Sequence, residues 1–266
     1  MVKETKERES NSGGGKGTLY IVGIGPGSLS ELTLRATEAL RESHCVVGYT
    51  RYVELIAPLT AGKEIYSTAM TGEVARSEKA IELAADGRTT AIVSSGDAGI
   101  YAMAGLVLEI LTSDKTELTL NDINVEVIPG VPAFVSAASL LGAPLMHDFA
   151  SISLSDILTP WEVIEERVRA AAQADFVIAL YNPRSSKRKE GLVKAVKDML
   201  EVKAPSTPVG IVKNASREGE EVRLTTLGKL PGFFEEIDML TIIIIGNKST
   251  SVKDGRMITP RGYKNI

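Results

Sequence analysis

The stretch that decides the fold is Thr18-Leu-Tyr-Ile-Val-Gly23-Ile-Gly25-Pro26-Gly27, a run of apolar residues that passes directly into glycines. Four later segments repeat this arrangement of a strand-like run followed by a loop of small residues. They lie at residues 91–101, 127–133, 177–185 and 257–263. Open α/β proteins bind ligands at the carboxyl ends of parallel strands, where small residues let a ligand approach the backbone. The five segments together predict an α/β protein with several ligand-contacting loops.

Composition excludes several classes of protein. The chain has 266 residues, with 30 Lys and Arg against 34 Asp and Glu, so its net charge of -4 gives no sign of nucleic-acid binding. Its only cysteine, Cys45, excludes an internal disulfide and a thiolate metal cluster, and we expect no metal site. No apolar stretch is long enough to span a membrane or to serve as a signal peptide, so we expect a cytoplasmic protein with no membrane partner.

Periodicity predicts two α/β domains. Residues 1–17 are polar and glycine-rich and are expected to form a disordered tail. Strand and helix patterns alternate over residues 18–145, which predicts a first domain with a mostly parallel sheet. Turn residues break this rhythm at 142–148. A second domain with a mixed sheet is expected over residues 146–248, followed by a tail over residues 249–266 that carries Thr259-Pro-Arg-Gly-Tyr263.

Helix starts in the first domain are predicted from polar residues. A helix is expected over residues 30–42, with Ser28 or Ser30 as its N-cap. Another is expected from residue 100 to residue 111. Asp97, in Ser95-Gly96-Asp97, could cap that second helix or could accept hydrogen bonds from the ribose or ammonium group of a ligand, and the residues alone leave both open.

The glycines at 23–27 invite comparison with a dinucleotide-binding fingerprint. Pro26 and Gly27 spoil the G-x-G-x-x-G spacing, whose last position is Ser28. The next predicted strand also ends without the acidic residue that would bind a ribose. A nicotinamide-binding Rossmann site is therefore disfavoured, while a tight turn after the strand explains the glycines alone.

The order of the loops carries a resemblance to a known family. From Thr18 to about Gly246 the chain resembles the tetrapyrrole (corrin/porphyrin) methylases. The resemblance lies in the order of G-x-G-P-G, S-G-D-x-G-x-Y and V-I-P-G-V-P-A, followed by a second domain. Within that family, Leu180-Tyr-Asn-Pro-Arg-Ser185 and Thr259-Pro-Arg-Gly-Tyr263 look like the branch of precorrin-3B and cobalt-factor III C-17 methyltransferases. Relatives that methylate other positions tend to carry Tyr-Met-Gly at 181–183 and Thr or Ser at Pro132.

The resemblance implies that S-adenosyl-L-methionine binds in a cleft between two α/β domains and leaves as S-adenosyl-L-homocysteine. It also implies a homodimer that methylates a corrin precursor at C-17 with ring contraction, in cobalamin biosynthesis. The implied cofactor contacts are Pro26, Ser95, Gly96, Asp97, Ile100, Pro132, Ala133, Asn182 and Ala215. The implied substrate contacts are Gly25, Pro26, Gly27, Arg184 and Arg261.

A basic stretch fits an anionic tetrapyrrole. Residues 183–203 hold seven Lys or Arg against three acids, headed by Arg184, whose guanidinium suits carboxylates. Lys194, Lys197 and Lys203 are expected on a solvated helix face. Ring contraction requires proton movement, for which the candidates by position are Asp97, Ser28, Ser30 and His147. For His147, a junction residue that makes one structural hydrogen bond is the favoured interpretation.

Two other functions are compatible with the fold. One is another methylase of the family, acting at a different ring position or making diphthine on a protein. The other is a non-catalytic tetrapyrrole-binding protein. The motif at residues 180–185 argues against the first, and the intact Ser95-Gly96-Asp97 argues against the second, because a carrier has no need of a cofactor loop.

Overall fold

The computed structural model describes residues 16–69, 71–114 and 116–264. The described residues divide into two compact units, a first unit of residues 16–24 and 32–130 and a second unit of residues 25–31 and 131–264. The sequence predicted one change of domain, at residues 142–148. The change lies instead at Gly130/Val131, and the short segment Gly25–Glu31 groups with the second unit.

The first unit is a five-stranded sheet in the order β3-β2-β4-β1-β5, with every pair parallel. Its strands are β1 (Thr18–Gly23), β2 (Cys45–Tyr49), β3 (Glu64–Thr68), β4 (Thr89–Ser94) and β5 (Asn124–Ile128). Its helices are α1 (Leu34–Glu42), α2 (Thr50–Leu55), α3 (Ala57–Thr60), α4 (Glu73–Ala85) and α5 (Met103–Leu111). The predicted parallel sheet is confirmed.

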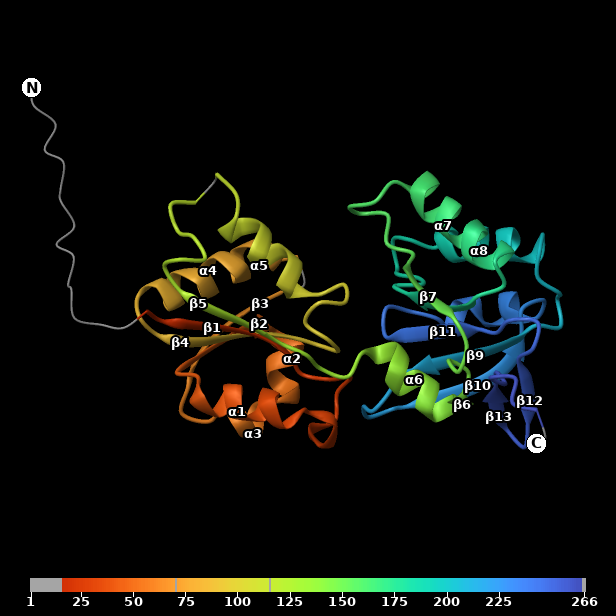
Figure 1. Ribbon diagram of the computed structural model, residues 1–266, viewed down its shortest axis with the longest axis horizontal. Coiled ribbons are helices and arrows are strands. Elements are labelled where there is room, and N and C mark those ends of the chain that lie inside the picture. The colour runs from red at the N-terminus through yellow and green to blue at the C-terminus, as the bar shows by residue number, and fades with distance from the viewer. Residues whose placement is uncertain (1–15, 70, 115, 265–266) are drawn as a thin grey trace, which may run out of the picture. The chain divides into compact units, whose positions relative to one another are not determined.

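Helices cover both faces of this sheet, with α4 and α5 on one face and α1, α2 and α3 on the other (Figure 1). Side chains alternate along β1 because successive strand residues point to opposite faces. Leu19 and Ile21 therefore join the core under α4 and α5, while Tyr20 and Val22 join the core under α1. Burial on both faces explains why β1 is a continuous run of apolar residues in the sequence.

Two helix starts in the first unit differ from the prediction. Thr33, rather than Ser28 or Ser30, caps α1, and its hydroxyl accepts a hydrogen bond from the Ala36 backbone N–H. Residues 29–31 form a separate 3-10 turn. The second predicted helix begins at Met103 instead of residue 100. The predicted tail, residues 1–17, lies outside the described residues except Lys16 and Gly17, and Gly17 is buried, with its carbonyl accepting from the Asn124 N–H.

The second unit holds a mixed five-stranded sheet in the order β10-β9-β11-β8-β7, in which only β7 and β8 are parallel. Its strands are β7 (Phe149–Ser153), β8 (Val177–Tyr181), β9 (Pro208–Lys213), β10 (Glu221–Thr226) and β11 (Thr241–Ile245), and its helices are α6 (Ala133–Leu141), α7 (Trp161–Gln173) and α8 (Glu190–Leu200), with a 3-10 helix at Leu230–Glu236. The predicted mixed sheet is confirmed, and β9 and β10 form an antiparallel hairpin in it.

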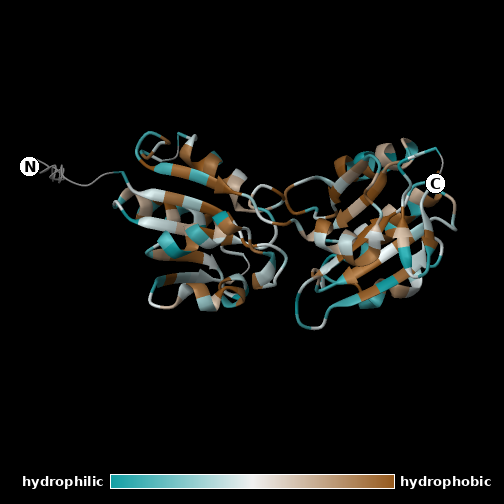
Figure 2. Cartoon of the chain, turned by 60° about the horizontal axis from the view of Figure 1, so that its bottom comes forward, coloured by the Kyte–Doolittle hydropathy of each residue, from teal (hydrophilic) through white to brown (hydrophobic). Residues whose placement is uncertain are grey.

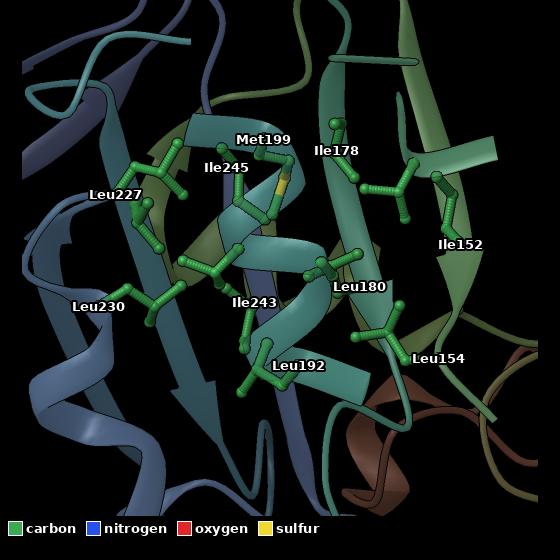
Figure 3. Close-up of a cluster of buried hydrophobic side chains, with 14 of the residues drawn as sticks. Ile152, Leu154, Ile178, Leu180, Leu192, Met199, Leu227, Leu230, Ile243 and Ile245 are labelled. Atoms are coloured by element: carbon green, nitrogen blue, oxygen red, sulfur yellow. The ribbon is translucent and has the colours of Figure 1, made fainter. Parts of the chain in front are cut away.

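The core of the second unit lies between its sheet and the pair α7 and α8, where Ile178 and Leu180 of β8 meet Leu192 and Met199 of α8 (Figure 3). Hydrophobic residues run along the strands of this sheet, as the hydropathy colouring shows (Figure 2). The opposite face is covered by α6 (Figure 1). Gly210 of β9 allows this packing because a Cβ there would meet the side chain of Leu141.

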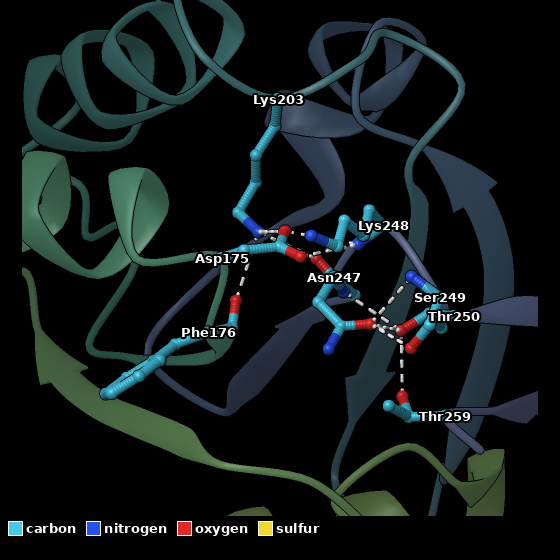
Figure 4. A network of polar contacts seen from close by, with 9 residues as sticks. Asp175, Phe176, Lys203, Asn247, Lys248, Ser249, Thr250 and Thr259 are labelled. Atoms are coloured by element: carbon cyan, nitrogen blue, oxygen red, sulfur yellow. Dashed lines mark hydrogen bonds and ion pairs between the residues drawn. The ribbon is translucent and has the colours of Figure 1, made fainter. Parts of the chain in front are cut away.

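The segment expected to be a tail is folded into the second unit. β13 (Arg256–Ile258) pairs on one side with β12 (Ser251–Lys253) and on the other with β6 (Gly142–Ala143) in a three-stranded sheet. Thr259 is fully buried, and its hydroxyl shares a hydrogen bond of 2.7 Å with that of Thr250 (Figure 4).

Lys203 is not on a solvated face as predicted, because its side chain is only 3% exposed. Its ammonium donates to the carbonyls of Phe176 at 3.0 Å and Gly246 at 3.2 Å and pairs with Asp175 at 3.3 Å (Figure 4). Asp175 also accepts from the backbone N–H of Lys248. Burial lowers the pKa of Lys203, and the Asp175 carboxylate partly opposes that shift. Lys203 thus joins the ends of α8, β8 and β11.

Candidate active site

Three glycines meet where β1, β4 and β5 of the first unit end. A Cβ on Gly23 would stand 2.7 Å from the Gly130 nitrogen and 2.7 Å from the Gly96 carbonyl oxygen, far inside van der Waals contact. A Cβ on Gly130 would also collide with the backbone of Gly23 and Gly96. Gly96 has a φ of +73°, which favours glycine. The close approach of three backbones explains why small residues follow these strands.

Asp97 bridges two of these strand ends. Its Oδ1 accepts from the Gly99 N–H at 2.8 Å, and its Oδ2 accepts from the Gly130 N–H at 3.1 Å. Because α5 begins at Met103 with Ala102 as its N-cap, the alternative in which Asp97 caps that helix is wrong. The carboxylate is half-buried, and each of its oxygens has a further lone pair with which to accept a hydrogen bond from a ligand.

The loop after Asp97 carries backbone strain. Tyr101 has a φ of +52°, which a residue with a Cβ rarely adopts, and its side chain is 53% exposed. Ser95 and Ile100, both predicted cofactor contacts, lie on either side of Asp97 between β4 and α5 and are half-buried. Strained backbone of this kind concentrates at ligand sites.

In the second unit, hydrogen bonds join the segments around the other predicted cofactor contacts. Pro132 is the N-cap of α6, and Ala133 is its first residue. The next backbone N–H, that of Phe134, donates to the Tyr181 hydroxyl at 3.2 Å. This bond ties the start of α6 to the end of β8, where Asn182 follows.

Asn182 and Ala215 both lie in turns that contain residues with positive φ angles. Asn182 has a φ of +51°, and its Nδ2 donates to the Ser153 hydroxyl at 2.9 Å. Ala215 is buried between Asn214 and Ser216, whose φ angles are +52° and +60°. The Ser216 hydroxyl hydrogen-bonds that of Ser136 in α6 at 2.8 Å. The structure therefore brings the segments of Pro132, Ala133, Asn182 and Ala215 into one hydrogen-bonded set.

The glycine segment after β1 contacts a residue that the sequence analysis missed. The carbonyl of Pro26, a buried residue, accepts a hydrogen bond of 2.6 Å from Nε of Arg217. Arg217 lies in the loop between β9 and β10, two residues after Ala215, and its side chain crosses over Gly27. The sequence held no signal for this contact because the two residues are 191 positions apart.

The predicted acid and base candidates have local partners. The hydroxyls of Ser28 and Ser30 hydrogen-bond each other at 2.7 Å and are exposed. His147 is half-exposed, and its Nδ1 accepts from the Asp148 backbone N–H at 3.0 Å. This contact matches the single structural hydrogen bond that the sequence favoured. Across the described ranges, His, Cys, Asp and Glu side chains form no group of three or more that could hold a metal ion.

The two predicted substrate arginines differ. Arg184 is buried, and its guanidinium donates to the Phe234 carbonyl and to the Glu235 carboxylate. A guanidinium committed to these partners does not project toward a ligand, so the structure argues against Arg184 as a substrate contact. Arg261 is exposed. It follows Thr259, whose burial fixes the start of this loop.

Comparison with known proteins identifies the family of the chain. Residues 18–231 match the family of tetrapyrrole (corrin/porphyrin) methylases. The chain is 53% identical over 245 residues to a probable cobalt-factor III C(17)-methyltransferase of Salmonella typhimurium, covering 92% of this chain and 99% of that protein. It is 52% identical over 249 residues to a cobalt-factor III methyltransferase of Priestia megaterium, covering 94% of this chain but only 46% of that longer protein.

A solved structure gives the same result. The crystal structure of the methyltransferase CobJ aligns with a TM-score of 0.83 and 34% identity, over 91% of this chain and 98% of that one. The predicted resemblance is confirmed: the chain belongs to the tetrapyrrole (corrin/porphyrin) methylase family.

Proposed function

We propose that this chain is an S-adenosyl-L-methionine-dependent methyltransferase that methylates C-17 of cobalt-factor III, with ring contraction, in cobalamin biosynthesis. The observation that carries the proposal is identity above one half, over nearly the whole chain, to a protein named for that reaction. The relative from Priestia megaterium is longer, and this chain spans only 46% of its length. The cobalt would arrive inside the substrate rather than as a resident metal.

The strand ends of the first unit fit the proposed cofactor. Gly23, Gly96 and Gly130 bring backbone without side chains to one edge of the sheet, and Asp97 stands there as a half-buried carboxylate. A carboxylate fits a cofactor that offers ribose hydroxyls and an ammonium group as donors. We therefore propose that Ser95, Gly96, Asp97 and Ile100 hold the cofactor. Pro132, Ala133, Asn182 and Ala215 stay predicted contacts.

Catalysis by this chain would consist mainly of orientation. When bound, S-adenosyl-L-methionine would supply an electrophilic methyl group on a sulfonium, whose sulfur would retain the electron pair of the broken bond. The residues have to hold the substrate carbon in line, and such positioning can contribute about 7–11 kcal/mol to lowering a barrier. Gly25, Pro26, Gly27 and Arg261 are the proposed substrate contacts. The residues predicted to move protons during ring contraction are still Asp97, Ser28, Ser30 and His147.

The test offers the purified protein cobalt-factor III or metal-free precorrin-3B, each with a methyl-labelled donor. Mass spectrometry of the tetrapyrrole then reports whether one labelled methyl is transferred. We expect transfer to cobalt-factor III at the higher kcat/KM. A higher kcat/KM for precorrin-3B would mean that the protein is a methyltransferase with the metal-free substrate. Methyl transfer to neither tetrapyrrole would refute the proposal.

We also propose a homodimer in the cytoplasm, as the family resemblance implies. Sedimentation at micromolar concentration tests the assembly, with a mass near twice 28.4 kDa expected. A mass near that of one chain would refute the dimer. Separately, no helix among the described residues is both long and apolar enough to cross a membrane.

A further inference from the structure

Arg217 makes a specific contact with the glycine segment of the second unit. Its Nε donates to the Pro26 carbonyl at 2.6 Å, a short distance for a hydrogen bond with a charged donor. The side chain reaches this carbonyl by crossing Gly27, where a Cβ would stand 2.8 Å from Nε and 3.1 Å from Cδ. Gly27 thus provides the space that the Arg217 side chain occupies.

The backbone of Arg217 is itself fixed. Its N–H donates to the Asn214 carbonyl at 2.9 Å, which closes a turn immediately after β9. Within this turn, the Ser216 N–H donates to the Glu220 carboxylate at 2.7 Å, and the Ser216 hydroxyl bonds Ser136 of α6 at 2.8 Å. Arg217 therefore extends from a turn that is anchored on a helix and a strand.

The Gly25–Gly27 segment needs such an outside partner. Gly25 has a φ of +71°, and glycine loses more conformational freedom on ordering than other residues. The Pro26 carbonyl lies between Gly25 and Gly27. A charge-assisted hydrogen bond to it restricts the backbone rotations of Pro26 and of Gly27. The conformation of the segment thus depends on a residue far away in the chain.

We propose that Arg217 is a positioning residue, which holds the Gly25–Gly27 segment in the conformation that receives the tetrapyrrole. The inference rests on the proposed function, because it assigns that segment to substrate binding. Arg217 acts through the Pro26 carbonyl rather than on the reacting atoms. Its loss should therefore weaken tetrapyrrole binding more than cofactor binding.

Two variants test the inference from opposite sides of the contact. Arg217→Gln removes the charged donor but keeps the backbone bond to Asn214. Gly27→Ala keeps the arginine as a residue but forces its side chain away from the Pro26 carbonyl. Each should raise the Michaelis constant for cobalt-factor III about tenfold, the scale of one lost charge-assisted hydrogen bond. The Michaelis constant for S-adenosyl-L-methionine should change less than about twofold. The double variant should resemble either single one, because both remove the same contact.

Hydrogen exchange supplies a readout that does not require turnover. The backbone N–H groups of Gly25 and of residues 27–31 should exchange faster in both variants than in the wild type. Arg223→Gln is the matched control, since Arg223 lies in the adjoining strand β10 and pairs with Glu221 and Glu236 on the surface. It should change neither exchange nor kinetics.

The outcomes separate the two proposals. An active wild type whose Michaelis constants stay unchanged in both variants overturns the role of Arg217 alone, as does unchanged exchange at Gly25 and residues 27–31. A wild type that methylates neither cobalt-factor III nor precorrin-3B overturns the proposed function and the role of Arg217 with it. If the increases in the Michaelis constant for cobalt-factor III add up in the double variant, the two substitutions do not act through the same contact, and the proposed role of that contact is overturned.

Discussion

Asp97 and Gly130 are 33 positions apart in the chain, and the Asp97 carboxylate accepts a hydrogen bond from the Gly130 backbone N–H at 3.1 Å. Asp97 follows β4 and Gly130 follows β5, and β1 lies between these strands in the sheet. The bond therefore passes over the end of β1, where Gly23 leaves room for it. One carboxylate thus fixes the edge at which we propose the cofactor binds.

Replacing Asp97 tests that assignment. Asp97→Ala should weaken the binding of S-adenosyl-L-homocysteine at least about tenfold, because losing a hydrogen bond to a charged group costs ~1.5–3 kcal/mol. Calorimetric titration measures this affinity, and thermal unfolding checks that the variant folds.

Asp122→Ala is the matched control for Asp97. Asp122 also accepts hydrogen bonds from a backbone N–H, and it accepts from a hydroxyl as well, both belonging to Thr119. Its loss should leave the cofactor affinity unchanged. Equal losses of affinity in both variants, or none in Asp97→Ala, would contradict a direct role for Asp97.

The glycine contacts predict opposite effects at two positions of the first unit. Gly23→Ala should lower the free energy of unfolding by more than about 2 kcal/mol, because its Cβ overlaps fixed backbone. Gly105→Ala in α5 should raise it by about 0.4–1 kcal/mol, since a Cβ there meets nothing within 4 Å and alanine favours the helix. Urea unfolding of each variant measures both. A Gly23→Ala protein as stable as the wild type would contradict the close approach.

Local sequence patterns predicted much of the fold. Most differences between the prediction and the structure come from contacts between residues that are far apart in the chain. The apolar run of β1 predicted a buried parallel strand because burial on both faces leaves no polar positions. The role of Asp97 depended on Gly130 and that of Arg217 on Pro26, and neither partner is visible within a local window. The boundary near residue 142 was misplaced because α6 packs on the second sheet, a tertiary choice that its own periodicity does not encode.

Lys203 predicts a pH dependence of stability. Burial lowers its pKa in the folded state, so the unfolded chain binds more protons between that lowered pKa and the ordinary lysine value of about 10.4. The contribution of Lys203 to the free energy of unfolding should therefore rise with pH through this window and fall as pH drops through the folded pKa.

Comparison with Lys203→Met isolates this effect. The variant leaves the carbonyls of Phe176 and Gly246 without their donor, so it should be less stable at neutral pH by about 1–3 kcal/mol. The difference between wild type and variant, measured by chemical unfolding, should widen toward pH ~10. A difference that narrows with rising pH would show that the Asp175 pair outweighs desolvation.

Arg184 is expected to act on stability rather than on substrate binding. Arg184→Gln should lower the free energy of unfolding by about 1–3 kcal/mol, because the Phe234 carbonyl loses its donor. Glu235→Gln is the control and should be nearly silent, since that side chain is 85% exposed. The opposite outcome is an Arg184→Gln protein that is as stable as the wild type but has a much higher Michaelis constant for the tetrapyrrole and an unchanged one for the cofactor. That result would support the substrate role that the sequence predicted.

The position of the transferred methyl tests the central claim most directly. The protein is incubated with cobalt-factor III and a donor whose methyl carbon is isotopically labelled, and the product is assigned by nuclear magnetic resonance. We predict a single labelled methyl, bonded to C-17 of a ring-contracted macrocycle, with S-adenosyl-L-homocysteine formed in equal amount. A label at any other ring position, or an unmethylated tetrapyrrole, would contradict the account.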